Sequence, residues 1–491
     1  MKTAGSKSKS WNGNRFWLID LRGLYLCGIL PLRSAPFWVW LLDQVVRRSP
    51  LDLLEFKWPS LTLKRPAIRR ALALVFLWLF QPALASSSPR SWQPLVVKGD
   101  LMKPILGVQL KKLELLAVVG TTVRPIPFQV DERLADGSFA LPYGPQPVAD
   151  DSPGVLDADD ELAMMISDLG DCDVDARLLP NRALEIRAID PLGGRDRCAY
   201  LAVVERPILS SADYVDYDPQ RTRIESDHYR IGFTQEFPHD FALQSHKGEN
   251  RPSLTDEFMV RVSARIFNYF EFKMTEHHDR ARLLAYGDGP IRVIRRVAHW
   301  VPLMFGLRSP YVIVQEIFYR DYNEGPFQVR FPWVPRFVFG DIKVMLGLDF
   351  VDASDYWLLW SGMTGPPVRI GDVGSLRDLE RSGHLPEINW VAIRGEHRIV
   401  LQTFKPTPDL MHLRQRLYLQ AGANLADKAE ASAQKSVHTA VGATLTGWEE
   451  LSSGWHYFNV VVINVPDSYS PQTIVAELLQ EPIIKLRIVS Q

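Results

Sequence analysis

Residues 257–275 read EFMVRVSARIFNYFEFKMT, and this stretch decides the fold class. The even positions hold Phe258, Val260, Val262, Ala264, Ile266, Phe270, Phe272 and Met274, and the odd positions include Arg261, Ser263, Arg265, Glu271 and Lys273. Successive side chains of a strand point to opposite faces, so this period of two predicts a long strand or hairpin with one apolar face.

Strand signals continue on both sides of this stretch. Turn residues precede strands predicted at 291–300 and 311–320, and the second is apolar on both faces, which leaves Gln315 and Glu316 in need of partners. Shorter strands are predicted at 95–97, 105–110, 115–119, 126–130, 184–189, 200–204, 338–344, 357–360, 390–393, 399–404 and 458–464. Helices are predicted at 409–421, 424–436 and 470–480. The fold class is therefore mostly β, with few helices near the C-terminus.

The segment 64–85 has the three parts of a secretory signal peptide. A basic stretch precedes an apolar run of ten residues at 71–80, and the small Ala83 and Ala85 suit cleavage after Ala85. The run is much shorter than the roughly 20 apolar residues of a membrane span. We expect a periplasmic or extracellular protein whose mature chain has no transmembrane helix. A short buried helix is the alternative.

Residues 1–63 are then expected to be a wrongly assigned start or a disordered leader, and a genuine cytoplasmic or membrane-anchoring leader is the alternative. The remaining chain divides into an N-terminal β-domain at 86–206, an antiparallel β-sandwich at 207–407 and a mixed C-terminal segment at 408–491. After residue 85 the chain holds 43 basic and 53 acidic residues, a net charge of about −10. This balance argues against nucleic acid as a partner.

Two cysteines, Cys172 and Cys198, lie beyond the predicted signal peptide. In an oxidising compartment they could close a disulfide worth about 3 kcal/mol. Two unpaired buried thiols are the alternative.

Two passages carry a family resemblance. The motif at 124–132, RPIPFQVDE, with GVLDADDEL at 154–162, resembles the N-terminal β-domain of secreted bacterial proteins, some of which occur with polysaccharide-degrading systems. The passages at 289–292 and 309–312 are similar to the central super-sandwich of galactose-mutarotase-like and rhamnogalacturonan-lyase-like proteins. The resemblance implies a fold rather than an activity, because one architecture hosts many functions.

The acidic turn at 150–161 places six carboxylates within twelve residues. Calcium prefers several oxygen ligands from a flexible loop, so a Ca²⁺ site is one interpretation and a solvated acidic loop is the other. The candidate metal ligands are Asp157, Asp159, Asp160 and Glu161. No other cofactor is indicated.

Candidate catalytic residues follow from the chemistry of lyases that act on uronic acids. Such an enzyme needs a His or Tyr to abstract a proton and a cation to stabilise the resulting negative charge. The candidates are His277, His278, Arg280, Tyr319 and Tyr322. Arg292, Arg295 and Arg296 could form a positive groove for such a polymer. An exposed polar turn is the alternative for the histidine pair.

A third polar group, Asp227-His228-Tyr229, precedes a strand. Neighbouring strand residues face opposite ways, so the spacing predicts no relay among the three. Ordinary polarity at a strand edge is the simpler interpretation.

An aromatic segment suggests glycan binding, since exposed aromatic rings stack on sugars and Arg binds beside them. The candidates are Trp333, Arg330, Arg336 and Trp357, and a buried aromatic core is the alternative.

Phosphate-loop, dinucleotide, zincin and esterase motifs are absent from the sequence. The main functional interpretation is therefore an exported, non-catalytic β-sandwich protein that binds a glycan or another exported protein. Two alternatives remain open: a carbohydrate-active enzyme, either a polysaccharide lyase or a hydrolase, and a scaffold of an envelope assembly. Whether the chain is an enzyme stays undecided at this point.

Overall fold

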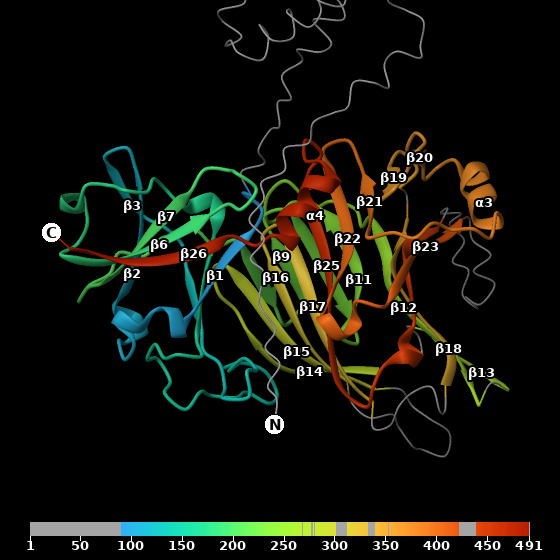
Figure 1. The fold of residues 1–491 in the computed structure, drawn as a ribbon, viewed down its shortest axis with the longest axis horizontal. Helices are drawn as coiled ribbons and strands as arrows, with labels where there is room; N and C mark the ends of the chain where they lie inside the picture. Colours follow the sequence, from blue (N-terminus) through green and yellow to red (C-terminus); the bar gives the residue numbers. More distant parts are fainter. Residues whose placement is uncertain are drawn as a thin grey trace, which may run out of the picture. The chain divides into compact units, whose positions relative to one another are not determined.

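The computed structural model describes residues 90–267, 269–275, 278, 280–300, 312–331, 339–351, 353–421 and 438–490. The predicted leader, the predicted signal peptide and the helix predicted at 424–436 lie outside these residues. Within them the chain forms four antiparallel sheets and two α-helices (Figure 1). The prediction of a mostly β fold with few helices is confirmed.

Two nine-stranded sheets form the largest part of the described chain. The β12 sheet runs in the order β23 (Arg414–Ala421), β24 (Thr439–Thr446), β18 (Phe339–Phe350), β12 (Thr255–Ile266), β11 (Phe237–Leu243), β10 (Tyr229–Thr234), β9 (Arg223–Ser226) and β8 (Val215–Asp218), with β13 (Phe270–Met274) paired to β12. The β15 sheet runs in the order β14 (Arg280–Gly287), β15 (Arg292–Trp300), β16 (Val312–Tyr319), β17 (Tyr322–Phe331), β25 (Gly454–Pro466), β22 (Arg398–Pro406), β21 (Trp390–Arg394), β19 (Trp357–Trp360) and β20 (Val368–Arg369). Their facing side chains form one shared core, so the pair is a β-sandwich.

Two smaller sheets form what we call the N-terminal module. One holds β1 (Pro94–Lys98), β5 (Glu161–Met165) and β4 (Gln129–Asp131), and the other holds β26 (Ile483–Ser490), β6 (Arg182–Ile189), β7 (Arg197–Val203), β2 (Leu113–Val119) and β3 (Thr122–Pro125). Their inner faces share a core of Leu, Ile, Val and Met side chains. The strand β26 pairs along its whole length with β6, so the module combines segments from both ends of the described chain.

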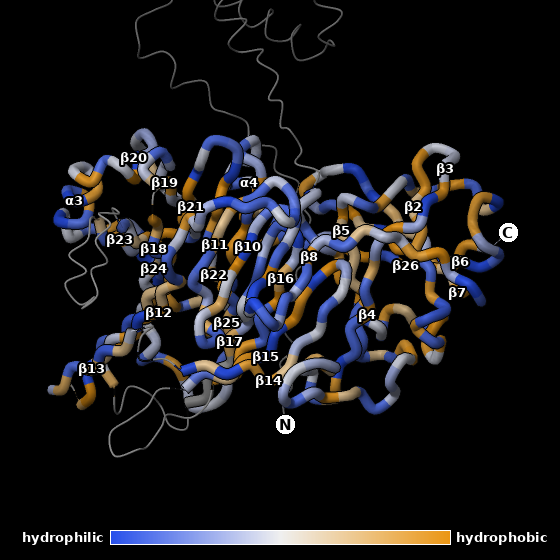
Figure 2. The backbone as a smooth tube through the Cα atoms, turned by 180° about the vertical axis from the view of Figure 1, so that it is seen from behind, coloured by the Kyte–Doolittle hydropathy of each residue, from blue (hydrophilic) through white to orange (hydrophobic). Residues whose placement is uncertain are grey.

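The deciding stretch forms the hairpin of β12 and β13, in which Ala264 faces Phe272 across the two strands. Most of its even-numbered side chains line the space between the two large sheets, as the period of two predicts: Phe258, Val260, Val262, Ala264, Phe272 and Met274. The strand β16 is largely buried on both faces, and its two polar residues have partners: Gln315 accepts a hydrogen bond from Phe139 N at 3.2 Å, and Glu316 pairs with Arg295 at 2.7 Å. Figure 2 shows the hydrophilic and hydrophobic residues that mix along the strands.

The two described α-helices are α3 (Val373–Arg381) and α4 (Pro471–Leu479). The prediction of a helix at 470–480 is confirmed, with Ser470 at the N-cap position and Pro471 at the first turn. The helix predicted at 409–421 is wrong, because β23 forms there as the edge strand beside β24. The strand predicted at 105–110 is also wrong. Short 3₁₀ turns occupy Gly99–Leu101, Lys103–Ile105, Leu110–Lys112, Ile166–Asp168, Ala176–Leu178, Pro408–Leu410 and Trp448–Glu450.

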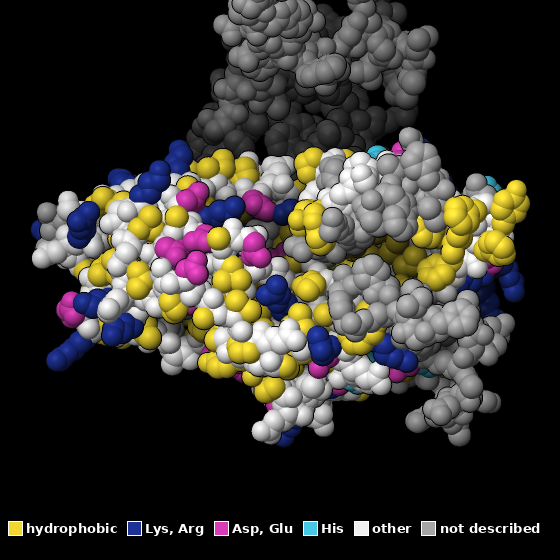
Figure 3. Space-filling view, turned by 90° about the horizontal axis from the view of Figure 1, so that it is seen from below, with side chains coloured by type: hydrophobic (Ala, Val, Ile, Leu, Met, Phe, Trp, Pro, Cys, Tyr) yellow, Lys and Arg dark blue, Asp and Glu magenta, His cyan; other side chains and the backbone are white. Residues whose placement is uncertain are grey.

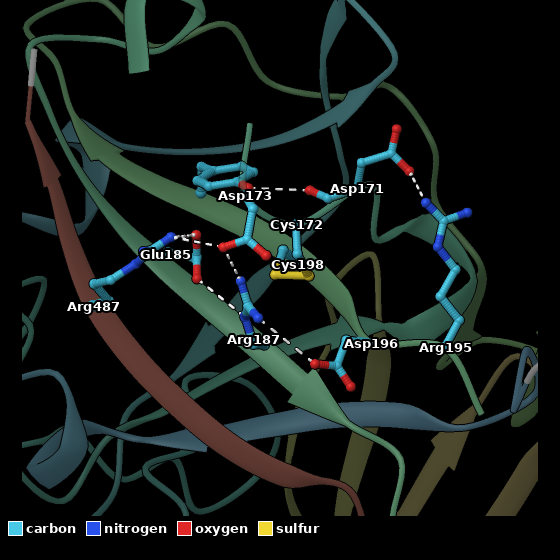
Figure 4. The surroundings of a disulfide bond; sticks show 10 residues. Asp171, Cys172, Asp173, Glu185, Arg187, Arg195, Asp196, Cys198 and Arg487 are labelled. Carbon is cyan, nitrogen blue, oxygen red and sulfur yellow. Dashed lines mark hydrogen bonds and ion pairs between the residues drawn. A yellow bond between two sulfur atoms is a disulfide. The ribbon is translucent and has the colours of Figure 1, made fainter. Parts of the chain in front are cut away.

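Cys172 and Cys198 form a disulfide that ties β7 to the loop before β6 (Figure 4). Of the two alternatives for these cysteines, a disulfide or two unpaired thiols, the structure shows the disulfide. Around it, Arg187 contacts Asp173 at 2.5 Å, and Arg487 from β26 contacts Glu185 at 2.7 Å. These ion pairs link the C-terminal strand to the disulfide region. Among the described residues, no helix is both long enough and apolar enough to cross a membrane.

Candidate functional site

The structure does not bring the predicted catalytic residues together. Tyr319 and Tyr322 are buried and stacked with ring centroids 4.7 Å apart, and burial raises the pKa of Tyr319 to about 12. Tyr319 Oη accepts a hydrogen bond from the buried Arg292 at 3.0 Å. His278 instead lies in the exposed turn before β14, where its Nδ1 contacts Thr275 Oγ1 at 2.9 Å.

Strand β15 separates Arg280 and His278 at one end from Tyr319 and Tyr322 at the other. Arg280 pairs with Trp300 at one end of β15, and Tyr319 pairs with Arg292 at the other. Eight residue steps at about 3.3 Å each place these ends roughly 26 Å apart. His277 lies outside the described residues.

The expected positive groove is wrong for two of its three members. Arg292 and Arg295 are 1% and 0% exposed. Arg292 forms ion pairs with Asp131 and Glu161, each at 2.7 Å, and Arg295 pairs with Glu316 and Glu236. Because the strand alternates faces, these two guanidinium groups neutralise buried carboxylates on opposite sides of the β15 sheet and are closed to a polymer.

The predicted glycan-binding residues are only partly described. Trp333 and Arg336 lie outside the described residues, and Arg330 is in β17 with its backbone paired to Trp455. Trp357 is 39% exposed in β19, and the guanidinium carbon of Arg369 lies 5.4 Å from its ring centroid. Trp357 thus offers one accessible aromatic face beside a cation.

The carboxylates of the predicted calcium site serve local contacts. Asp160 Oδ2 accepts a hydrogen bond from Asp157 N at 2.9 Å, and Asp157 Oδ1 accepts one from Asp159 N at 3.3 Å. Glu161 forms ion pairs with Arg133 and Arg292. Burial raises the pKa of Asp157 to about 7 and that of Asp160 to about 6. These contacts orient the turn and attach it to the β15 sheet.

A different group places three ligand atoms within 4.8 Å of one another in the described part of the chain: Asp256, Asp349 and His438. These residues come from β12, from β18 and from the position before β24, which are neighbours in the β12 sheet. No local sequence pattern indicates this group, because its members lie far apart along the chain.

A polar site occurs where one end of the sandwich meets the loops before β8 and after β11. Lys247 forms ion pairs with Asp216 at 2.8 Å and with Asp213 at 3.6 Å. Asp288, in the turn between β14 and β15, accepts a hydrogen bond from Tyr217 N at 3.5 Å, and Asp227 follows β9. We call these four carboxylates and their lysine the Lys247 cluster.

Three members of the Lys247 cluster have raised pKa values. Loss of surrounding water raises the pKa of Asp288 to about 6, and the charges of Asp216 and Asp213 add to the rise, although the side chain remains exposed. The same cause raises the pKa of Asp227 and that of Asp213, where Asp216 contributes further. The cluster thus contains one carboxyl group, that of Asp288, with a pKa of about 6 beside an ion-paired carboxylate.

A histidine lies next to this cluster. His228 Nδ1 contacts Asp321 Oδ1 at 2.5 Å, and the buried Asp321 is also held by Arg320 at 2.7 Å. Arg320 also donates a hydrogen bond to Ser91 O at 2.6 Å, and its guanidinium group lies over the ring of Tyr214. A buried carboxylate that fixes the imidazole in this way orients its other nitrogen.

The sequence identified Asp227-His228-Tyr229 as a dense polar group but did not find its partners. The prediction that the three form no relay among themselves agrees with the structure, since His228 pairs with Asp321 and Tyr229 donates to Tyr319 O at 2.6 Å. Asp321 is 93 residues away from His228. Only the turn between β16 and β17 brings it near.

Comparisons with known proteins give structural neighbours only. No family model and no curated protein matches the chain. The chain is similar to a solved protein of glycosyl hydrolase family 38 from Enterococcus faecalis, with 7% identity and a TM-score of 0.41, over 81% of this chain and 45% of that one. It is similar to an alpha-mannosidase from Enterococcus faecalis V583, with 7% identity and a TM-score of 0.41, over 81% of this chain and 44% of that one.

A glycosyl hydrolase of family 92 is a further neighbour, with 8% identity and a TM-score of 0.20, over 51% of this chain and 30% of that one. The chain therefore spans less than half the length of each of these three. None of them is named as rhamnogalacturonan-lyase-like, and at this similarity no residue role transfers to this chain.

The main functional interpretation is corrected by these neighbours. A non-catalytic module that binds a glycan or an exported protein is contradicted, because the neighbours are glycoside hydrolases. The alternative of a carbohydrate-active enzyme agrees with them better.

Proposed function

We propose that this chain is a carbohydrate-active enzyme that hydrolyses glycosidic bonds, with the Lys247 cluster as its active site. The observation that carries the proposal is Asp288, an exposed carboxyl whose pKa is raised to about 6 beside the ion-paired Asp216. Glycoside hydrolysis uses two carboxyl groups, one protonated and one ionised, on either side of the scissile bond.

In this mechanism Asp288 is the general acid. Below pH 6 it is mostly protonated and can donate its proton to the leaving oxygen of the glycosidic bond. Asp216, ionised beside Lys247, acts as the second carboxylate, either toward water or toward the sugar carbon. His228, held by Asp321, lies beside Asp227 at the edge of the cluster and orients the substrate through hydrogen bonds.

The charges of the site favour a neutral glycan over an acidic one. Four carboxylates surround one lysine, so a polyanionic chain would meet repulsion. The lyase alternative needs a cation free to stabilise an enolate, but Arg320 is engaged with Asp321 and Ser91. Hydrolysis is therefore the better-supported reaction.

We further propose that the enzyme is exported through the segment 64–85 and works in the periplasm or outside the cell. The disulfide between Cys172 and Cys198 supports this location, because such bonds persist in oxidising compartments. We also propose that the two large sheets form a super-sandwich of the galactose-mutarotase-like kind.

The test is hydrolysis of a panel of neutral oligosaccharides and 4-nitrophenyl glycosides by the purified protein, followed by reducing-sugar release. Asp288→Asn should lower kcat by about 10²-fold or more, the usual contribution of a general acid. The rate of the wild type should fall as the pH rises through about 6, because Asp288 then loses its proton.

Asp355→Asn is the matched control, since Asp355 is an exposed carboxylate paired with Arg369 and neither residue belongs to the Lys247 cluster. It should leave the rate unchanged. A wild-type rate in Asp288→Asn, or no cleavage of any neutral glycan while an unsaturated product forms from a uronic acid polymer, would remove the assignment.

A further inference from the structure

A large cavity lies between the β12 sheet and the β15 sheet. Its volume is about 410 Å³, and its walls are almost entirely apolar side chains from both sheets. Protein interiors contain few voids larger than a water molecule, and ligand pockets begin near 300 Å³. A space of this size and composition is typical of a binding site for an apolar molecule.

The cavity extends along the strands of both sheets. Alternate residues line it from Phe258 to Ala264 on β12 and from Val312 to Phe318 on β16. Six residue steps at about 3.3 Å give it a length of roughly 20 Å along the strands. The lining also crosses β11, β12, β13 and β18 in one sheet and β15, β16, β17 and β25 in the other, so the cavity has room for an acyl chain that lies along the strands.

The wall holds few polar groups, among them His239, whose buried Nδ1 has no hydrogen-bond partner, and two carboxylates engaged by protein partners. Glu316 is paired with Arg295 at 2.7 Å, and Glu324 accepts a hydrogen bond from Asn459 Nδ2 at 2.6 Å. Sugars need several hydrogen-bond partners along their length, and such partners are scarce here. The lining therefore selects for a hydrocarbon chain.

One wall of the cavity continues into an exposed apolar hairpin. Phe272 and Met274 of β13 line the cavity, and the tip of the same hairpin exposes Phe267, Tyr269 and Phe270 by 60%, 88% and 70%. Figure 3 shows hydrophobic side chains in a hollow of this face. Exposed apolar groups of this kind mark interaction sites, and a methionine in the wall adapts readily to a flexible ligand.

We propose that the cavity between the two sheets binds the fatty-acyl chain of a lipid. The proposal goes beyond the glycosidase function and does not depend on it. The Lys247 cluster adjoins the start of β15 at Arg292, whereas β15 reaches the cavity at its other end, through His299 and Trp300. The source of the acyl chain is either a free fatty acid or a membrane lipid, and the two share this chemistry.

The first arm of the test titrates the purified protein with saturated fatty acids of increasing length by calorimetry. Binding of one chain per protein is expected, with affinity rising by about fourfold per methylene until the cavity is full. Dodecanoic acid serves as the reference ligand. The second arm incubates the protein with phosphatidylcholine vesicles that carry a fluorescent acyl chain and measures transfer of the label.

Ala264→Phe fills part of the cavity and should weaken dodecanoate binding by about tenfold or more, because several methylene positions are lost. Ser263→Phe adds the same bulk on the opposite face of β12 and is the matched control, with binding unchanged. Thermal unfolding of both variants verifies that they fold.

Binding in the first arm identifies a free acid as sufficient, and transfer in the second arm alone identifies an esterified lipid as the source. No binding in either arm, or undiminished binding in a folded Ala264→Phe variant, would overturn the proposal. Neither result would change the hydrolysis assay of the Asp288 variant, so the two proposals fail independently.

Discussion

The two faces of the β15 sheet differ in how they are filled. The outer face packs against the N-terminal module and α4, where Ile294, Val461, Ile463 and Ile474 are 0% exposed and Arg292 binds two carboxylates. The inner face meets the β12 sheet and leaves a cavity of about 410 Å³. One set of strands thus serves as a tightly packed support on one side and as a ligand wall on the other.

The difference follows from the side chains that alternate along each strand. On β15, Arg292 and Ile294 turn outward, and Val293 and Arg295 turn inward. Dense packing on one face holds the strands in place, so an unfilled space on the other face costs the fold less. Stability and binding can therefore be changed separately by substitutions one residue apart.

The largest expected effect is on the outer face. Arg292→Met should lower the free energy of unfolding by about 3–5 kcal/mol, because it removes the cation paired with Asp131 and leaves Glu161 with Arg133 alone. Urea unfolding followed by circular dichroism measures the loss. Arg177→Met, whose side chain is 85% exposed and pairs with Asp175, should cost about 1 kcal/mol or less. Equal losses in the two variants would mean that the Arg292 network does not anchor the outer face.

A matched pair on β25 compares the two faces directly. Val461 faces outward and is 0% exposed, and its neighbour Val460 lines the cavity. Val461→Ala should lower the free energy of unfolding by about 2 kcal/mol, as in a well-packed core, whereas Val460→Ala should cost about 1 kcal/mol or less. A larger loss for Val460→Ala in chemical denaturation would show that the inner face is the better packed one.

The smallest expected effect is the pH dependence of the free energy of unfolding that arises from Asp160, beside the Arg292 network on the outer face. Asp160 is 0% exposed and lies next to Glu161 of the Arg292 network, and burial raises its pKa to about 6. A carboxyl whose pKa is raised by folding favours the folded state when protonated, so its contribution is lost as the pH rises through about 6.

Asp160→Asn should therefore increase the free energy of unfolding at pH 7 by on the order of 1 kcal/mol and flatten its change between pH 5 and pH 7. Unfolding of the wild type at both pH values supplies the reference. Asp151→Asn, an exposed neighbour in the same turn, is the control. A slope unchanged in Asp160→Asn would locate the pH dependence elsewhere.

The sequence predicted the sheets better than the site. Alternation in 257–275 indicates the β12–β13 hairpin because a period of two is a local property of the chain. The helix expected at 409–421 failed because its apolar residues are also compatible with an edge strand, and pairing with β24 decided the outcome. Pairing is a long-range contact that no local pattern contains.

The candidate site was recognised only in fragments. His228 and Asp227 stand out as a polar group, but their partners Asp321 and Lys247 come from separate turns that fold toward them. The arginines of β15 illustrate the opposite error. Two of the three arginines that suggested a positive groove, Arg292 and Arg295, are buried, and only their ion pairs with carboxylates on each face of the sheet reveal why.

The pairing of β26 with β6 has a consequence for biosynthesis. The five-stranded sheet cannot be completed until a strand made about 300 residues after β6 arrives, and such long-range closure is slow. Until then the edge of β6 stays open to partners from other chains, which is a route to aggregation. Under the export proposed above, this delay keeps the five-stranded sheet incomplete until β26 has been synthesised, which suits a chain that crosses a membrane unfolded.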